Sequence, residues 1–343
     1  MTPATETESG GDAGRTPPFR RILVVCDLSQ DDAETLGLAA DLADACGADL
    51  AALAVVDMAS EMERLSRFAS VAPEEIERRH LETCRQRLIE RVGTAVSSRE
   101  VAAEVRVGKP FLEIIRHALA HGHDLVVKQA EELHGLHRYL FGSTDQHLLR
   151  KCPCPVWLVR PDARRPSGTV LAAVDVDAFS AGEPATQAGL NRRIVETAAE
   201  IAAFDGATLH ILHVWDAPGE GLVRLWADAP GADSAVRRYV SEIEAERRQA
   251  LEDLVAAART WLGPATVQRI GLVHHLEQGA PGTAIPDRAR ALRADILVMG
   301  TLSRTGVPGF IIGNTAEDVL NGVGCSVVTV KPPGYVSPVA AGW

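Results

Sequence analysis

The sequence has few aromatic residues, few cysteines and no long apolar run. Aromatics make up 4% of the 343 residues, so the 46% hydrophobic content must build its cores from Ala, Leu, Val and Ile. The six cysteines have no regular spacing, which argues against a disulfide framework. No stretch approaches the roughly 20 apolar residues that cross a bilayer. The polar stretch over residues 1–18 lacks the apolar segment of a signal peptide. We therefore expect a soluble, cytoplasmic protein.

Basic residues are fewer than acidic residues. The chain has 35 Lys and Arg against 46 Asp and Glu, a net charge of −11. A nucleic acid would have to bind a local basic patch against this overall field. We find no such patch with interleaved aromatics. The sequence therefore predicts neither a nucleic-acid partner nor a membrane partner.

Two stretches of the chain repeat each other without gaps. The run that starts at Asp124 matches the run that starts at Asp295, 171 positions later. The same offset places Gly142-Ser143-Thr144 on Gly313-Asn314-Thr315. An internal duplication fits the two domains that a chain of this length is expected to form. The predicted boundaries are a disordered tail over 1–18, a first domain over 19–161, a linker over 162–168, a second domain over 169–332 and a tail over 333–343.

Strands and helices alternate in both halves. In the first half we predict strands over 21–27, 49–56, 101–107, 125–127 and 155–159, and helices over 31–45, 74–92 and 110–120 and after Gly142. In the second half the strands are 170–175, 208–215, 267–275, 296–299 and 326–330, and the helices are 188–204, 235–262, 284–292 and 315–321. This alternation predicts an α/β fold of two tandem doubly wound domains, flavodoxin-like or Rossmann-like. Each domain should hold a five-stranded parallel sheet with helices on both faces.

Ligands of such folds bind outside the carboxyl ends of the strands, where the strand order reverses. Two sets of residues fall at those ends and nominate two sites. They are Asp27, Val55 and Gln129 in the first half, and Asp175, Val214 and Gly300 in the second.

The second half also predicts an anion site. A glycine-rich loop leads from the run at 296–299 to Gly313, and a helix follows directly. Free amides and the positive end of a helix dipole at such a junction attract phosphate. Asn314 and Thr315 are residue types that cap helix N-termini with side-chain oxygens, so we expect them to cap this one.

At these residues the chain resembles the universal stress protein family, specifically its tandem-domain E type. The family motif is G-x2-G-x9-G-(S/T), and the positions of Gly300, Ser303, Gly313 and Asn314 keep its spacing. The resemblance covers nearly everything from Arg21 to about Tyr335. It implies a non-catalytic protein that supports survival under growth arrest, oxidation or DNA damage. It also implies that the two halves pair through their last strands as an intramolecular pseudo-dimer, and a homodimer of whole chains is a further expectation.

The resemblance implies a nucleotide site in the second half, with ATP or another adenine nucleotide and Mg²⁺. Its motif is degenerate, since Ser303 replaces a glycine and Asn314 replaces Ser or Thr. The implied residues are Asp175, Val214, Gly300, Ser303, Gly313, Asn314 and Thr315.

The first half departs further from the motif, because Gln129 and Glu132 replace both leading glycines. A carboxylate about 6 Å from a phosphate costs roughly 2 to 3 kcal/mol at an effective dielectric near 20. We therefore expect a ligand pocket that does not take ATP. It is formed by Asp27, Val55, Gln129, Glu132, Gly142 and Ser143.

Other functions remain open. The first half fits an apolar ligand, and the whole chain fits a scaffold without a ligand. Slow ATP hydrolysis or nucleotidyl transfer is the enzymatic alternative, although no Walker-type loop and no Ser-His-Asp pattern occur. His210 and His213 lie three apart on a predicted strand, hence on opposite faces, and adjacent His274 and His275 do too. The sequence therefore predicts no catalytic residue and no metal site.

Overall fold

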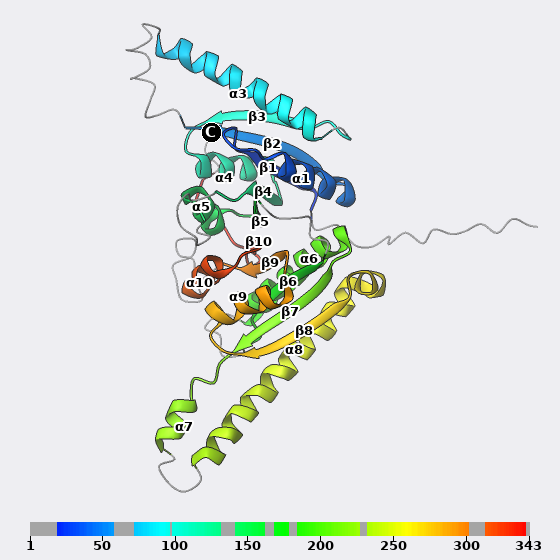
Figure 1. Ribbon diagram of the computed structural model, residues 1–343, viewed down its shortest axis with the longest axis vertical. Helices are drawn as coiled ribbons and strands as arrows, with labels where there is room; N and C mark the ends of the chain where they lie inside the picture. The colour runs from blue at the N-terminus through cyan, green and yellow to red at the C-terminus, as the bar shows by residue number, and fades with distance from the viewer. Residues whose placement is uncertain are drawn as a thin grey trace, which may run out of the picture.

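The computed structural model of the chain describes residues 19–57, 72–96, 98–131, 141–161, 168–177, 184–226, 232–301 and 313–340. Within these residues the ten strands form one continuous sheet (Figure 1). The first half supplies β1 (Arg21–Cys26), β2 (Asp49–Val56), β3 (Ala102–Val107), β4 (Leu125–Gln129) and β5 (Val156–Val159). The second half supplies β6 (Thr169–Val174), β7 (Thr208–Trp215), β8 (Leu272–Gln278), β9 (Ile296–Gly300) and β10 (Ser326–Val330).

The strand order is β3-β2-β1-β4-β5-β10-β9-β6-β7-β8, with parallel pairing inside each half. Each half therefore has the predicted doubly wound topology. The halves meet where β5 and β10 pair in the antiparallel sense, with Val327 opposite Leu158 and Thr329 opposite Val156. This antiparallel junction places the carboxyl ends of the two sets of strands at opposite edges of the sheet.

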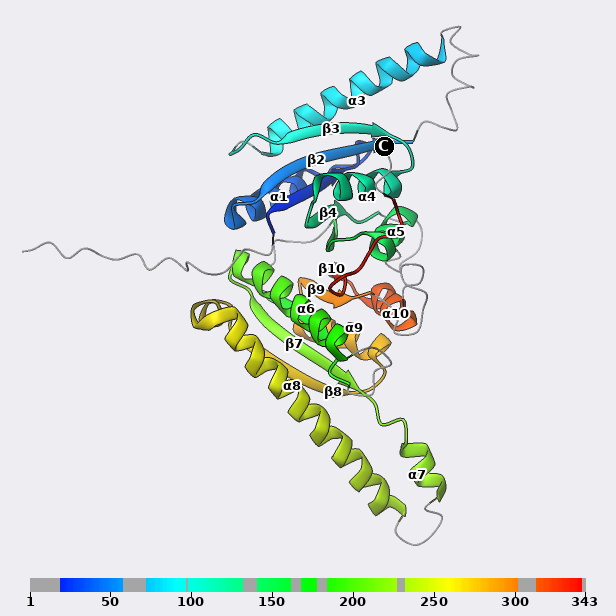
Figure 2. The same cartoon turned by 180° about the vertical axis from the view of Figure 1, so that it is seen from behind.

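Helices cover both faces of the sheet (Figure 2). One face carries α1 (Ala33–Cys46), α3 (Pro73–Ala95), α6 (Pro184–Asp205) and α8 (Ala232–Ile270). The other carries α4 (Pro110–His121), α5 (Ser143–Lys151), α9 (Pro281–Leu292) and α10 (Asn314–Gly322). Because the central strands are covered on both sides, they are apolar throughout, and β10 is buried at every position.

One predicted strand begins too early. Residues 267–270 belong to α8, and β8 starts only at Leu272. The β-branched residues of this segment suggested a strand, but Leu262, Thr266 and Ile270 are buried at a spacing of four, the period of a helix. Gly263, at φ 76°, interrupts α8, and Gly271, at φ 53°, ends it. The short helix α7 (Glu220–Trp226) was not predicted.

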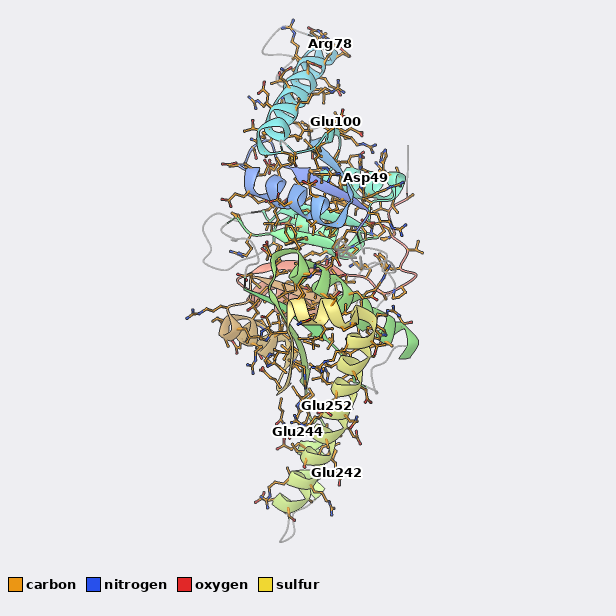
Figure 3. All side chains as sticks on the ribbon, turned by 90° about the vertical axis from the view of Figure 1, so that its right-hand side faces the viewer. Asp49, Arg78, Glu100, Glu242, Glu244 and Glu252 are labelled. Atoms are coloured by element: carbon orange, nitrogen blue, oxygen red, sulfur yellow. The ribbon has the colours of Figure 1, made fainter. Side chains whose placement is uncertain are left out.

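The long helices α3 and α8 carry charged, solvent-facing surfaces. Figure 3 shows Arg78 on α3 and Glu242, Glu244 and Glu252 along α8. Glu244 pairs with Arg248 on the next turn, at 2.6 Å. Such pairs favour a solvated helix face and contribute only tenths of a kcal/mol each. In the part of the chain that the structure describes, no helix has the length and apolar character to cross a membrane.

A buried lysine ties the two halves together beside the β5–β10 junction. Lys331, which follows β10, is 1% exposed. Its Nζ donates to the backbone oxygen of Leu149 on α5 and to the hydroxyl of Thr301, which follows β9. Burial lowers the pKa of Lys331 to about 7. The amine therefore satisfies acceptors from both halves without requiring a full charge in the core.

Candidate functional site

In each half the strand order reverses once, between β1 and β4 in the first half and between β6 and β9 in the second. Asp27 follows β1 and Gln129 ends β4, while Asp175 follows β6 and Gly300 ends β9. We call these two sets of strand ends the first-half and the second-half strand-end sites. They are the ligand positions expected of doubly wound sheets.

In each half a valine lies beside the aspartate on the neighbouring strand: Val55 beside Asp27, and Val214 beside Asp175. Val174 pairs with His213, so the next positions, Asp175 and Val214, are neighbours across β6 and β7. Val214 is 8% exposed and packs in the core cluster with α4, α5, α9 and α10. Its side chain is thus a core side chain, and a ligand would meet its backbone. Val55 is half-buried against the same cluster.

Asp175 is held in a defined position by hydrogen bonds. The Asn191 side chain on α6 accepts from the Asp175 backbone N–H at 3.1 Å and donates to its carbonyl at 2.7 Å. One carboxylate oxygen of Asp175 accepts the N–H of Asp177 at 3.0 Å. Asp177 in turn forms an ion pair with the buried Arg247 of α8. The turn after β6 is therefore fixed from both α6 and α8.

Gly300 permits a close approach between α6 and the end of β9. A Cβ at this position would lie 2.9 Å from the Leu190 side chain. In the first half Gln129 stands at the matching position, and its side chain reaches Thr35 at 3.4 Å and Gln30 at 3.5 Å. At this strand end the first half therefore has a polar side chain, that of Gln129. In the second half the Leu190 side chain packs directly against Gly300.

The N-terminus of α10 has no side-chain cap among the described residues. Gly313 is the N-cap residue, at φ −61° and ψ 141°, and the helix begins at Asn314. The predicted capping by Asn314 and Thr315 is therefore wrong, because both residues already belong to the first helical turn. Both are exposed. The first amides of α10 thus keep unsatisfied donor capacity at the positive end of the helix.

The N-terminus of α5, at the first-half site, is occupied by the protein itself. Asp145 in its first turn is fully buried, and its carboxylate lies 2.8 Å from Lys128 Nζ. The other oxygen of Asp145 accepts the backbone N–H of Glu131 at 2.8 Å. Burial raises the pKa of Asp145, and the Lys128 ammonium opposes this rise. A negative charge of the chain therefore already sits at this helix terminus.

A second carboxylate covers the same helix start. A Cβ at Gly142, the N-cap of α5, would lie 1.6 Å from Glu131 Oε2. Glu131 also lies 3.6 Å from Lys128 Nζ. The predicted pocket residue Ser143 is the first residue of α5, directly behind this carboxylate. The predicted residues Glu132 and Ser303 lie outside the described residues.

The two halves therefore differ in charge at matched positions. The offset of 171 residues that aligns Gly142 with Gly313 places Met299 at the position of Lys128 and Ala316 at that of Asp145. Ala316 is buried at the start of α10, and Met299 is buried in β9. The second half thus holds apolar groups where the first half holds a buried ion pair.

Several residues at the strand-end sites were not predicted from the sequence. Lys128 and Asp145 lie 17 positions apart, with no periodic signal that links them. Leu190, Asn191 and Arg247 come from helices whose angle of approach the sequence does not encode locally. A comparison of the two halves of the sequence could have pointed to this pair. Within the best-matched segment, Lys128 and Asp145 are charged, whereas Met299 and Ala316 at the matching positions are apolar.

A comparison with protein families finds two copies of one family in the chain. The sequence model named Usp, described as Universal stress protein family, matches residues 18–160 and 189–331. Among curated proteins, Universal stress protein E of Escherichia coli K12 is 31% identical over 331 residues, covering 94% of this chain and 96% of the relative. Universal stress protein E of Photorhabdus laumondii is 27% identical, covering 94% and 98%.

Solved structures share the whole tandem arrangement. A functionally unknown protein from Pseudomonas aeruginosa PAO1 matches with a TM-score of 0.65 and 25% identity, covering 92% of this chain and 93% of that one. A universal stress protein from Archaeoglobus fulgidus matches with a TM-score of 0.56 and 20% identity, covering 91% and 98%.

Proposed function

The chain belongs to the universal stress protein family, and on that premise we propose that it is a non-catalytic stress-response protein that binds an adenine nucleotide in its second half only. The nucleotide is ATP with Mg²⁺ or a close relative, and its binding alters contacts with partners in the cytoplasm. The role is protection during growth arrest, oxidation or DNA damage, as the family resemblance implies.

The difference between the two helix N-termini carries this proposal. At α10, Gly313 leaves the first amides uncapped by the described side chains, and buried Ala316 adds no charge, so the one first-turn carboxylate is that of Glu317, which is exposed to solvent. At α5, Asp145 and Glu131 place two carboxylates where a phosphate would bind. The Lys128 ammonium offsets one of these two charges, so the excess of one negative charge repels a phosphate by about 2 to 3 kcal/mol at 6 Å and an effective dielectric of 20, less where solvent screens it. An anion therefore prefers α10.

The other second-half residues fit the same ligand. Gly300 places no side chain of its own at the end of β9, and Asp175 carries a carboxylate on a backbone that Asn191 holds in place. We assign the phosphates to the α10 amides and the base to the edge formed by Asp175 and Val214. A bound Mg²⁺ would neutralise phosphate charge, and an Asp oxygen is the ligand type it prefers.

Equilibrium binding of Mg-ATP to two variants tests the proposal. Gly313→Asp adds a carboxylate at the α10 N-terminus, and φ −61° with ψ 141° is a backbone conformation that any residue adopts. It should weaken binding by about 10- to 100-fold, which corresponds to 1.4 to 2.8 kcal/mol. Asn321→Asp adds the same charge at the exposed C-terminal turn of α10 and is the matched control.

Equal weakening by both variants, or no binding by the wild type, would refute the second-half site. Phosphate release measured on the same samples separates binding from catalysis. Turnover well above background that is abolished in Asp175→Ala would replace the binding function with an enzymatic one.

A further inference from the structure

Three histidines gather at the C-terminal end of α4, at the edge of the first-half sheet opposite the strand-end site. His117 and His121 lie one helical turn apart, and His123 follows after Gly122, which ends the helix at φ 63°. Each offers one ring nitrogen, and these three nitrogens lie within 4.8 Å of one another. The rings of His121 and His123 are stacked on the His117 ring, with centroids 4.2 and 5.1 Å away and interplanar angles of 29° and 13°.

The hydrogen bonds of the first two histidines leave one nitrogen of each available. His117 Nε2 lies 3.3 Å from a carboxylate oxygen of Glu104, so this nitrogen carries the proton. Its Nδ1 is buried and has no partner among the described residues. His121 Nδ1 lies 3.1 Å from the His117 carbonyl and donates to it, which leaves the lone pair on Nε2. Both arrangements are those that orient metal-binding imidazoles in proteins.

His123 supplies the third nitrogen. Both of its ring nitrogens are buried without a hydrogen bond of ordinary geometry to the described residues. Burial is the main cause that lowers the pKa of His123, and it lowers that of His117 to about 4. Buried polar atoms without partners cost free energy, and a metal ion would satisfy two of them at once.

We propose that His117, His121 and His123 bind a divalent first-row transition metal, with Zn²⁺ the expected ion and Glu104 as the carboxylate that orients His117. Tetrahedral Zn²⁺ with bonds of about 2.0 to 2.1 Å needs ligand nitrogens about 3.3 Å apart. The three nitrogens must therefore close by up to about 1.5 Å, and the stacked rings must turn so that their in-plane lone pairs converge on one point. His121 is exposed at the helix end and can rotate at a cost of about 1 kcal/mol.

The surroundings allow access and set the affinity. His123 lines a groove of about 460 Å³ between the halves, with Asp124 and Pro153 from the first half and Arg193 from the second. A water or small ligand from this groove would complete the coordination. The nearby Arg21 and Arg106 side chains oppose a cation, so we expect weaker binding than at a closed four-ligand site.

Titration of the metal-free full-length protein with Co²⁺ alone, followed by its visible absorption, tests the site. The wild type should bind one equivalent with the intense bands of four-coordinate cobalt, and Zn²⁺ should displace it. His121→Ala removes an exposed ligand and should weaken binding at least about tenfold. His274→Ala removes another exposed histidine, on β8, and should leave the bands unchanged.

Glu104→Gln tests the orienting carboxylate and should weaken binding by about 10- to 100-fold without changing the stoichiometry. Thermal unfolding of the metal-free variants checks that each remains folded. Absence of the bands in the folded wild type would overturn the proposal. Equal binding by wild type and folded His121→Ala would overturn it as well, as would loss of binding in His274→Ala.

Discussion

The buried ion pair of the first half can be replaced by the residues that the second half uses at the same positions. Lys128→Met and Asp145→Ala install the side-chain types of Met299 and Ala316. Lys128 is 6% exposed, Asp145 is fully buried, and the charged atoms lie 2.8 Å apart. Lys128→Met leaves the buried Asp145 carboxylate without its ammonium partner, and Asp145→Ala leaves Lys128 with only the Glu131 carboxylate, 3.6 Å away, whereas the double variant removes both buried charges together.

We expect each single variant to lose about 3 to 5 kcal/mol of unfolding free energy, since a buried charge without its partner is strongly destabilising. The double variant should lose only about 1 to 2 kcal/mol. Apolar residues often replace a buried pair at little cost, and the remaining loss is the Glu131 N–H, which no longer has Asp145 as its acceptor. The coupling energy between the two substitutions should therefore be about 4 kcal/mol or more.

Denaturant unfolding of the four proteins measures this coupling. Tryptophan fluorescence reports on both halves, through Trp157 in β5 and the four tryptophans that follow it in the sequence. Far-ultraviolet circular dichroism, recorded in parallel, reports on the whole chain. Losses in the double variant that equal the sum of the single losses would refute the reasoning, because the two charges would then be stabilised by groups other than each other.

Three further predictions concern ionisable side chains outside the Lys128–Asp145 pair. The folded-state pKa of Lys331 is about 7 against 10.5 for the ordinary side chain, so the unfolded chain binds the extra proton between these values. The free energy of unfolding should therefore rise by about 2 kcal/mol from about pH 7 to about pH 9 in the wild type but not in Lys331→Met. Denaturant midpoints measure this rise. An equal rise in both proteins would contradict the lowered pKa of Lys331. Burial lowers the pKa of His117 to about 4, so its neutral form favours the fold, and stability should fall as pH drops from about 6.5 toward 4, less so in His117→Gln. Arg91 binds three backbone oxygens of the turn after β1 and the buried Asp32 carboxylate. Arg91→Met should cost about 3 kcal/mol, whereas Arg78→Met, at an exposed pair, should cost less than about 0.5 kcal/mol, and equal losses in thermal unfolding would refute this account.

Much of the fold follows from local sequence signals. Apolar runs such as those of β4 and β9 are too short for helices, and the glycines after α1 and α4 adopt φ 65° and 63°, as helix-ending glycines do. Where the prediction was wrong, a local signal competed with tertiary packing. The segment over 267–270 has strand-forming residues, yet it packs as the last turn of α8 because Thr266 and Ile270 face the core.

Less of the candidate site than of the fold could be predicted from the sequence. The positions of Asp175 and Gly300 at the strand ends followed from the alternation of strands and helices. The first-half N-terminus could be judged only from the structure, because the carboxylate of Asp145 reaches it from within the helix itself. Glu131 directly precedes Glu132 in the sequence, but its position over Gly142 depends on the course of the backbone after β4.

The stoichiometry of Mg-ATP binding tests the central claim most directly. Calorimetric titration of the wild-type chain should give one site per 343 residues. The double variant with Lys128→Met and Asp145→Ala should still give one site, because Glu131 continues to cover the start of α5. Two equivalent sites in the wild type, or one site that Gly313→Asp leaves intact, would contradict the assignment of the nucleotide to the second half.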